Sequence, residues 1–209
     1  MDKSIRGVIL QPMKKLYLFG LVAVLFSYGC GMRSIPTAQN AAEAASAEVI
    51  NQYKRRADLI PNLVKTVQGY ASHEKETLQG VVEARAKATS IQIDPSKSTP
   101  EQLQKYQQAQ GQLSQALGRL LVVSENYPQL KADQNFRDLQ AQLEGTENRI
   151  TVARQRYIES IRIFNTLVTT PPESWYNAIF LKRDKMPQWD VTPAEKETIS
   201  APPAVDFGK

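Results

Sequence analysis

The sequence contains one cysteine and one histidine among its 209 residues, and these two shortages argue against several classes of enzyme. A helical zinc-protease motif needs a second histidine one turn away from the first, and the chain has only His73. His73 is also the only candidate base for a serine or cysteine nucleophile, and it lies in a predicted capping turn. We find no glycine-rich phosphate-binding loop. We therefore expect a non-enzymatic protein without a metal or cofactor, and no small-molecule substrate.

A basic patch is also missing, although the net charge is +5 and the pI is about 9.3. Three of these charges lie before residue 30, where four basic residues oppose Asp2. The rest of the chain is close to neutral, so it offers no surface that would release many counterions on binding a nucleic acid. We expect no nucleic-acid partner. The single cysteine likewise leaves no disulfide within the chain to stabilise the fold.

No long apolar run occurs near the N-terminus, but a short one does. From Met13 the chain reads MKKLYLFGLVAVLFSYGC, with two lysines, an apolar run and then small or neutral residues before Cys30. This is the order of a secretory signal, and the run is shorter than the roughly 20 residues that span a bilayer. The segment resembles a bacterial lipoprotein signal, in which Cys30 is lipidated and becomes the new N-terminus. Ser27 and Tyr28 depart from that pattern, which usually has a leucine and a small residue there.

The alternative is an uncleaved anchor that keeps a free cysteine. Both interpretations tether the protein to membrane lipid with its folded part outside the cytoplasm, in the cell envelope. Gly31 follows the cysteine where an aspartate would favour inner-membrane retention, so delivery to the outer membrane is favoured in a Gram-negative cell. Residues 1–12 precede Met13, which is a second plausible start.

The chain divides into four parts by composition: a signal or leader (1–29), a small and polar tether (30–40), a helical region (41–170) and a proline-rich tail (171–209). No alternating strand pattern occurs before residue 170. Apolar residues recur at steps of three, four and seven in the helical region, as expected for packed helices. These spacings predict an all-α fold, an elongated antiparallel bundle of about four long helical segments.

Helix boundaries are marked by capping residues. Thr99, Pro100 and Gln102 together predict a capping box at one helix start, and Ser72 is a candidate cap for the preceding helix. Asp133 is predicted to cap the last and longest helix. Large residues fall seven apart along that helix and mostly small residues accompany them, a pattern that lets a neighbouring helix approach closely. The large residues are Phe136, Leu143, Ile150, Tyr157 and Phe164.

The tail has two tryptophans and many prolines, and we expect it to be extended or partly helical. Its aromatic residues have two interpretations. The simpler is that they pack back over the end of the bundle, and the other is that they contact a lipid interface, which tryptophan and tyrosine favour. These aromatic residues are Trp175, Tyr176, Phe180 and Trp189.

Pro61 lies inside a segment that is otherwise helical, YKRRADLIPNLVKTVQGYASHE. A proline removes one backbone donor and displaces the carbonyl of Ala57, so the helix is predicted to kink or restart there. Arg56 falls on the apolar face, where an unpaired charge is very costly. We predict a polar network inside the bundle that fixes the helix register. It would use Arg56 and Asp58 with the acidic partners Glu125 and Glu147; the alternative is that this segment forms a kinked surface for a partner.

Three strings carry a resemblance to a known family: the segment around Pro61, SENYPQLKADQNFRDLQAQLEGTENRITVARQRY, and the ending APPAVDF. They resemble the LemA family of bacterial membrane-anchored proteins over residues 45–168 and again in the tail. The resemblance implies a bundle of long antiparallel helices behind an N-terminal anchor, and it supplies no catalytic or binding residues. The lipoprotein-like signal and the stretch TTPPESWYNAIF depart from the family pattern.

These observations predict an envelope-tethered helical bundle that acts as a scaffold or binds another envelope protein. The alternative is an accessory factor that recruits substrates to a membrane protease or transport complex.

Overall fold

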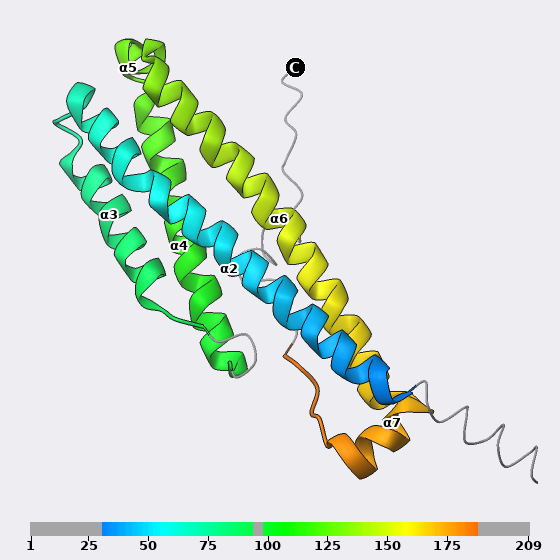
Figure 1. The fold of residues 1–209 in the computed structure, drawn as a ribbon. Coiled ribbons are helices and arrows are strands. Elements are labelled where there is room, and N and C mark those ends of the chain that lie inside the picture. Colours follow the sequence, from blue (N-terminus) through cyan, green and yellow to red (C-terminus); the bar gives the residue numbers. More distant parts are fainter. Residues whose placement is uncertain (1–30, 94–97, 188–209) are drawn as a thin grey trace, which may run out of the picture. The chain divides into compact units, whose positions relative to one another are not determined.

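The structure is a computed structural model that describes residues 31–93 and 98–187. These residues form helices and no strand, which confirms the all-α prediction (Figure 1). The helices in chain order are α2 (Gly31–Tyr70), α3 (Lys75–Ser90), α4 (Pro100–Ser124), α5 (Pro128–Ala132), α6 (Gln134–Thr169), α7 (Glu173–Tyr176) and the π-helix η1 (Asn177–Leu181).

The described residues divide into two compact units. The first, called the terminal unit below, contains the start of α2 (31–41) and the chain from the end of α6 through η1 (161–186). The second, called the bundle unit, is formed by residues 42–160. Because α2 and α6 are long, each contributes residues to both units.

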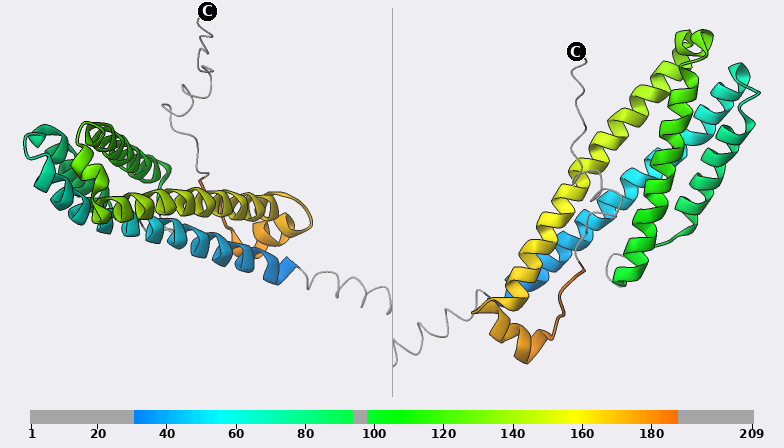
Figure 2. Two further views of the ribbon diagram at one scale, coloured as in Figure 1. Left: turned by 90° about the horizontal axis from the view of Figure 1, so that it is seen from above. Right: turned by 180° about the vertical axis from the view of Figure 1, so that it is seen from behind.

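The bundle unit is an antiparallel arrangement of four helices, α2, α3, α4 and α6, each running opposite to the one before it (Figure 2). Its core is built by the apolar positions that the sequence repeats at helical spacing. The predicted stripe of α6 is buried at Phe136, Leu143 and Ile150, and its small companion Thr146 is 1% exposed. Large and small residues therefore alternate at the packed face of α6, as predicted.

Two predicted helix starts are confirmed. Thr99 accepts a hydrogen bond from the backbone of Gln102, and the Gln102 side chain accepts one from the Thr99 backbone at 3.0 Å, which completes the capping box. Asp133 accepts a hydrogen bond from the Phe136 backbone at 2.9 Å at the start of α6. Each bond satisfies a backbone donor that a helix terminus would otherwise leave free.

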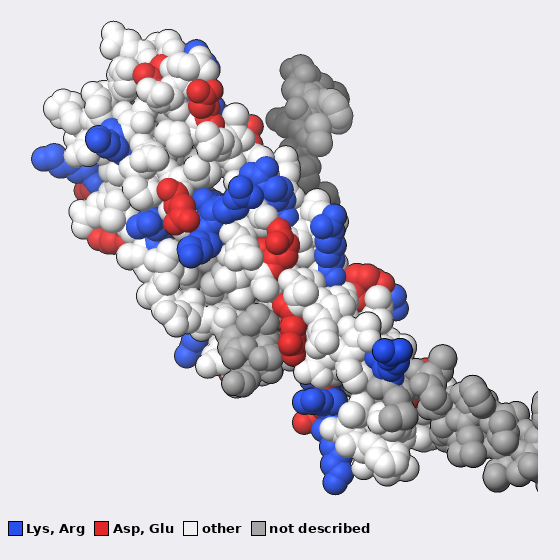
Figure 3. All heavy atoms as spheres, in the orientation of Figure 1, with Lys and Arg blue, Asp and Glu red and all other residues white. Residues whose placement is uncertain are grey.

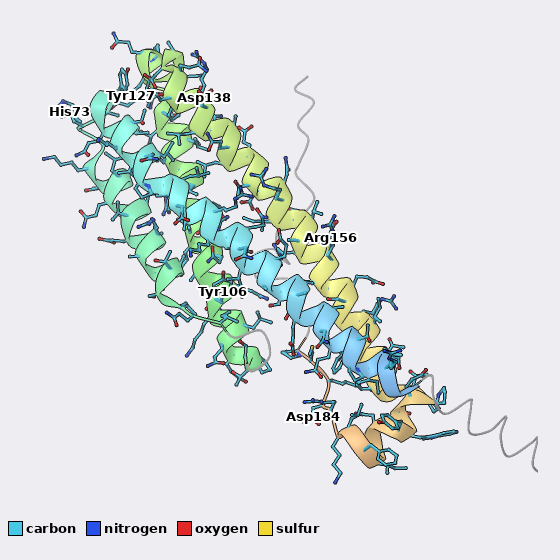
Figure 4. The ribbon with its side chains drawn as sticks, viewed as in Figure 1. His73, Tyr106, Tyr127, Asp138, Arg156 and Asp184 are labelled. Atoms are coloured by element: carbon cyan, nitrogen blue, oxygen red, sulfur yellow. The ribbon has the colours of Figure 1, made fainter. Side chains whose placement is uncertain are left out.

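The predicted cap at Ser72 is wrong, because α3 begins at Lys75 and has Glu74 at its cap position. Glu74 makes no capping bond with its side chain. Its carboxylate instead accepts a hydrogen bond of 2.8 Å from the Tyr127 hydroxyl, which joins the α2–α3 turn to the segment before α5 (Figure 4). The side chain at the cap position is used here to connect two turns.

The stretch expected as a tether, residues 30–40, is helical from Gly31 onward. Ile35 and Ala38 are buried in the core of the terminal unit, together with Phe164 and Val168. Ile35, Ala38 and Ala42 are three and four residues apart, so the helical spacing already begins before residue 41. The small, polar composition of this stretch concealed that spacing.

The tail is partly helical, as expected, since residues 173–181 form α7 and η1. Trp175 and Phe180 do not pack back over the helices, because their exposed fractions are 63% and 68%. Leu181 instead packs against the core of the terminal unit. Trp189, the other aromatic residue in question, lies outside the described residues.

Candidate functional site

Arg56 lies in the middle of the bundle unit and is 2% exposed. Its Nη1 donates to the Ser114 hydroxyl and to Glu147 Oε2, both at 2.8 Å. Its Nη2 donates to the side-chain oxygen of Gln110 at 2.8 Å and to the Gln110 carbonyl at 3.3 Å. One guanidinium on α2 thus binds acceptors on α4 and α6, which we call the Arg56 network.

The network extends to the remaining long helix of the unit. The side-chain nitrogen of Gln110 donates to the Ala88 carbonyl on α3 at 3.4 Å. Arg56 and Gln110 therefore connect all four helices of the bundle unit through hydrogen bonds. Such bonds are satisfied in one register only, so the network favours a single alignment of the helices.

Two tyrosines form an aromatic wall beside the guanidinium. The Arg56 guanidinium lies 5.1 Å from the centre of the Tyr53 ring, and the Tyr53 and Tyr106 rings meet edge to face at 5.6 Å. A cation placed over an aromatic face is attracted by the ring quadrupole. Burial raises the pKa of Tyr106, and repulsion from Tyr53 raises it further. The Tyr106 phenol, whose position Figure 4 shows, therefore stays neutral at physiological pH.

Pro61 is accommodated close to this network without a break in the helix, since α2 is continuous from Gly31 to Tyr70. The predicted restart does not occur. A proline cannot donate to the carbonyl four residues earlier, which leaves Ala57 without its helical partner. Arg85 on α3 supplies the missing donor, because its Nε bonds the Ala57 carbonyl at 2.8 Å. The α2–α3 contact therefore satisfies the group that Pro61 leaves free.

The structure brings only some of the predicted site residues together. The structure brings Arg56 and Glu147 together, whereas Asp58 is exposed and no hydrogen bond or ion pair joins it to another described residue. Glu125 lies after the end of α4 and pairs with Lys131 at the surface, away from Arg56. Cys30 lies outside the described residues.

Sequence reasoning missed Ser114, Gln110 and Arg85. Gln110 and Ser114 are four residues apart and so share one face of α4. They lie in a stretch so rich in glutamine that the pair does not stand out from its neighbours. Arg85 could have been found by asking which donor replaces the one that Pro61 lacks, although the sequence does not say which helix supplies it.

A cleft of about 590 Å³ opens next to the network, between α2, α3 and α4. Its wall is apolar and aromatic, and its rim carries charges of both signs in Lys54, Asp58 and Arg85. Gln110, which also belongs to the network, lines the cleft. The other lining residues are Ile50, Tyr53, Ala57, Ala88, Thr89, Ile91, Gln92, Ile93 and Tyr106.

Metal-ligating side chains do not cluster in the part of the chain that the structure describes. Within residues 31–93 and 98–187, no three His, Cys, Asp or Glu side chains gather where they could hold a metal ion. His73 lies in the exposed turn between α2 and α3, at one end of the bundle unit and away from Tyr106 (Figure 4). None of the helices that the structure describes combines the length and apolar character needed to cross a bilayer.

Known proteins were compared with the chain. A protein LemA of Metamycoplasma hominis is 26% identical over 188 residues, covering 88% of this chain and 81% of the relative. The magnetosome protein MamQ of Magnetospirillum gryphiswaldense is 24% identical over 184 residues, covering 80% of this chain and 67% of the relative. The family model described as LemA family matches residues 45–207, which include the Arg56 network and the whole cleft. The chain therefore belongs to the LemA family.

Proposed function

We propose that the protein is a membrane-tethered, non-enzymatic helical bundle that binds another envelope protein through the cleft beside the Arg56 network. The observation that carries this proposal is the cleft itself, an open space of about 590 Å³ with an apolar wall and a charged rim. An open apolar groove with polar groups at its edge is a common form of binding site.

A segment of a partner protein suits this cleft. Ile50, Ile91 and Ile93 provide apolar contacts, while Lys54 and Asp58 at the rim offer charges of opposite sign. An amphipathic helix places its apolar face in such a groove and keeps its charged face at the rim. The Arg56 network holds α2, α3 and α4 in register, so the groove is already formed before a partner arrives.

The tether is supported by the sequence before Gly31, where two lysines and an apolar run lead to Cys30. The resemblance to the LemA family implies an N-terminal anchor, and the family model matches the chain after this segment, over residues 45–207.

Photo-crosslinking in living cells tests the cleft. A benzoylphenylalanine replaces Lys54 at the rim, and in a matched control it replaces Lys87, an exposed lysine of α3 that does not line the cleft. We expect a discrete crosslinked protein from position 54 and not from position 87. Adding Thr89→Trp, which fills the cleft from an exposed position, should abolish the crosslink at position 54.

Equal crosslinking from both positions, or a product at position 54 that Thr89→Trp leaves unchanged, would contradict the proposal. The identity of the captured protein separates the two candidate roles. A subunit of a membrane protease or transport complex would favour the accessory role, and any other envelope protein would favour a scaffold.

A further inference from the structure

The terminal unit carries an exposed apolar surface that the cleft and the Arg56 network do not use. Trp175, Ile179 and Phe180 have exposed fractions of 63%, 67% and 68%. All three come from α7 and η1, and we call these three residues the apolar tip. A cluster of large exposed apolar side chains on a small element commonly marks an interaction surface.

The tip is held in place by its own unit. Asn177 is buried, and its side chain bonds both the backbone carbonyl and the backbone nitrogen of Arg183 at 2.9 Å. Asn165 on α6 does the same for Met186, at 3.0 and 2.9 Å. The side chains of Asn177 and Asn165 thus hold the irregular segment that follows η1 in place. The exposed aromatic residues belong to an ordered structure and are not part of an unattached loop.

The apolar residues of this segment divide between two directions. Leu181 and Met186 pack against the core of the terminal unit, which contains Ile35 and Phe164. The tip residues face solvent, and the Phe180 ring lies 4.9 Å from the Tyr176 ring. The core contacts explain why the segment folds back, but they do not explain why the tip residues that face solvent are apolar.

Basic residues surround the tip. Lys182, Arg183 and Lys185 follow η1 directly and are exposed. The described part of the terminal unit carries five basic and two acidic residues, whereas residues 42–160 carry fifteen basic and fourteen acidic ones. Figure 3 shows blue side chains on either side of the pale surface near α7, with Asp184 among them (Figures 3 and 4). The terminal unit therefore carries most of the excess positive charge of the described residues, and three of its five basic residues follow the apolar tip directly.

The chain enters this same unit from its N-terminal segment. Gly31 begins α2 directly after Cys30, and Ile35 packs in the core that also receives Leu181. Figure 1 shows the blue start of α2 beside the end of α6 and α7. A bilayer that holds the residues before Gly31 would therefore lie close to the tip.

We propose that the apolar tip inserts into the interface of an anionic phospholipid bilayer, while Lys182, Arg183 and Lys185 bind the headgroups. Tryptophan favours the membrane interface, and basic side chains near it are attracted by anionic lipids. This inference rests on the tether of the proposed function and is independent of the cleft. The tip gives the protein a second lipid contact, which fixes the orientation of the terminal unit on the membrane.

Tryptophan fluorescence of the full chain, reconstituted through its N-terminal segment into vesicles, tests the insertion. The chain has two tryptophans, so Trp189→Phe leaves Trp175 as the only one. In vesicles of phosphatidylglycerol and phosphatidylcholine we expect the Trp175 emission to shift to shorter wavelength. Lipids brominated along their acyl chains should quench most of this emission.

A matched control places the tryptophan on the bundle unit. Val122→Trp, in a chain with Trp175→Phe and Trp189→Phe, uses a position that is 71% exposed in α4. Its emission should be neither shifted nor quenched. Lys182→Glu with Lys185→Glu should weaken the quenching of Trp175 in anionic vesicles and change it little in pure phosphatidylcholine.

Asn177→Ala tests whether the ordered structure of the tip matters in addition to its composition. The variant keeps every exposed aromatic residue and removes the bonds to Arg183. We expect it to reduce the quenching of Trp175. Unquenched Trp175 in the parent chain would overturn the proposal, as would equal quenching at position 122. Crosslinking between two copies through position 175 in the vesicles would assign the tip to self-association. The photo-crosslink at position 54 reports the cleft separately, so a failure of the tip proposal can be distinguished from a failure of the cleft proposal.

Discussion

At the scale of single residues, Arg56 shows how a helical core accommodates a charge. The guanidinium is buried, but the Glu147 side chain that balances it is 54% exposed. The pair therefore reaches from the interior to the surface, and the carboxylate keeps part of its hydration. Only one of the two charges has to be desolvated fully, and neutral acceptors on Gln110 and Ser114 compensate the two terminal nitrogens of the guanidinium, whereas its buried Nε has no hydrogen-bond partner among the described residues.

Arg56→Ala should destabilise the protein by about 2–5 kcal/mol, the usual cost of truncating a large buried side chain. The change empties the space of a large buried side chain and removes the donor to the side-chain oxygen of Gln110. It does not strand a buried carboxylate, because Glu147 is half exposed. Urea unfolding of residues 31–209, followed by circular dichroism, measures the effect.

The control is Arg55→Ala, which changes the neighbouring, exposed arginine and should cost no more than about 0.5 kcal/mol. Equal unfolding midpoints for the two variants would show that the Arg56 network does not stabilise the fold.

Only part of this network could be predicted from the sequence. Arg56 lies on an apolar face, which requires a partner inside the bundle, and Glu147 lies on the facing side of α6. Glu125 fits the same argument, but α4 ends at Ser124, so its side chain leaves the packed face and reaches Lys131. Asp58 is two positions from Arg56, and residues at that spacing point to different sides of a helix.

At the scale of elements, α2 keeps its helical path through Pro61 because α3 replaces a lost hydrogen bond. The donor is Arg85, whose Nε reaches the Ala57 carbonyl at 2.8 Å. An unpaired buried carbonyl costs about 1–3 kcal/mol, so this bond matters for the pairing of the two helices. The same contact lines the cleft, which ties the helix irregularity to the binding surface.

Arg85→Ala should therefore cost about 1–3 kcal/mol in the parent chain and less in a Pro61→Ala chain. In the second background the alanine at position 61 supplies its own backbone donor to Ala57, so Arg85 is no longer needed for that bond. A double-mutant cycle by urea unfolding should give a coupling energy of about 0.5–3 kcal/mol.

Lys87→Ala in both backgrounds is the control, since Lys87 is exposed on the same helix and touches neither group. Additive effects of Arg85→Ala and Pro61→Ala would contradict the proposed exchange of donors.

Helix boundaries could be predicted from the sequence where a residue type has a single common role at the end of a helix. Thr99 with Gln102, and Asp133 with the residues after it, cap their helices as the sequence predicts. The Ser72 prediction fails because α3 begins at Lys75, and Glu74 at its cap position bonds a tyrosine from a distant turn. The contacts that hold the tail were not predicted, because they come from single asparagines, Asn165 and Asn177, which have no recognisable pattern.

At the scale of the whole molecule, the two proposed roles rest on different units. The bundle unit contains the cleft and the Arg56 network, and its charges nearly balance. The terminal unit contains the basic residues around the apolar tip and receives the chain from its N-terminal segment. Partner binding and membrane contact would then depend on different residues, so each can be removed without the other.

The tether leads to the last prediction, which concerns Cys30. If the N-terminal segment is a lipoprotein signal, cells grown with labelled palmitate should incorporate the label into this protein. Cys30→Ala should abolish labelling and leave the signal uncleaved, because the lipidated cysteine is the residue before which the signal is removed. Cys30 is the only cysteine of the chain, so no other thiol can carry the label. Cys30→Ser, which keeps a polar side chain of similar size, should behave in the same way as Cys30→Ala.

An unlabelled parent protein with an intact N-terminal segment would instead identify an uncleaved anchor, and the apolar tip would then approach the bilayer beside an apolar segment rather than beside an attached lipid.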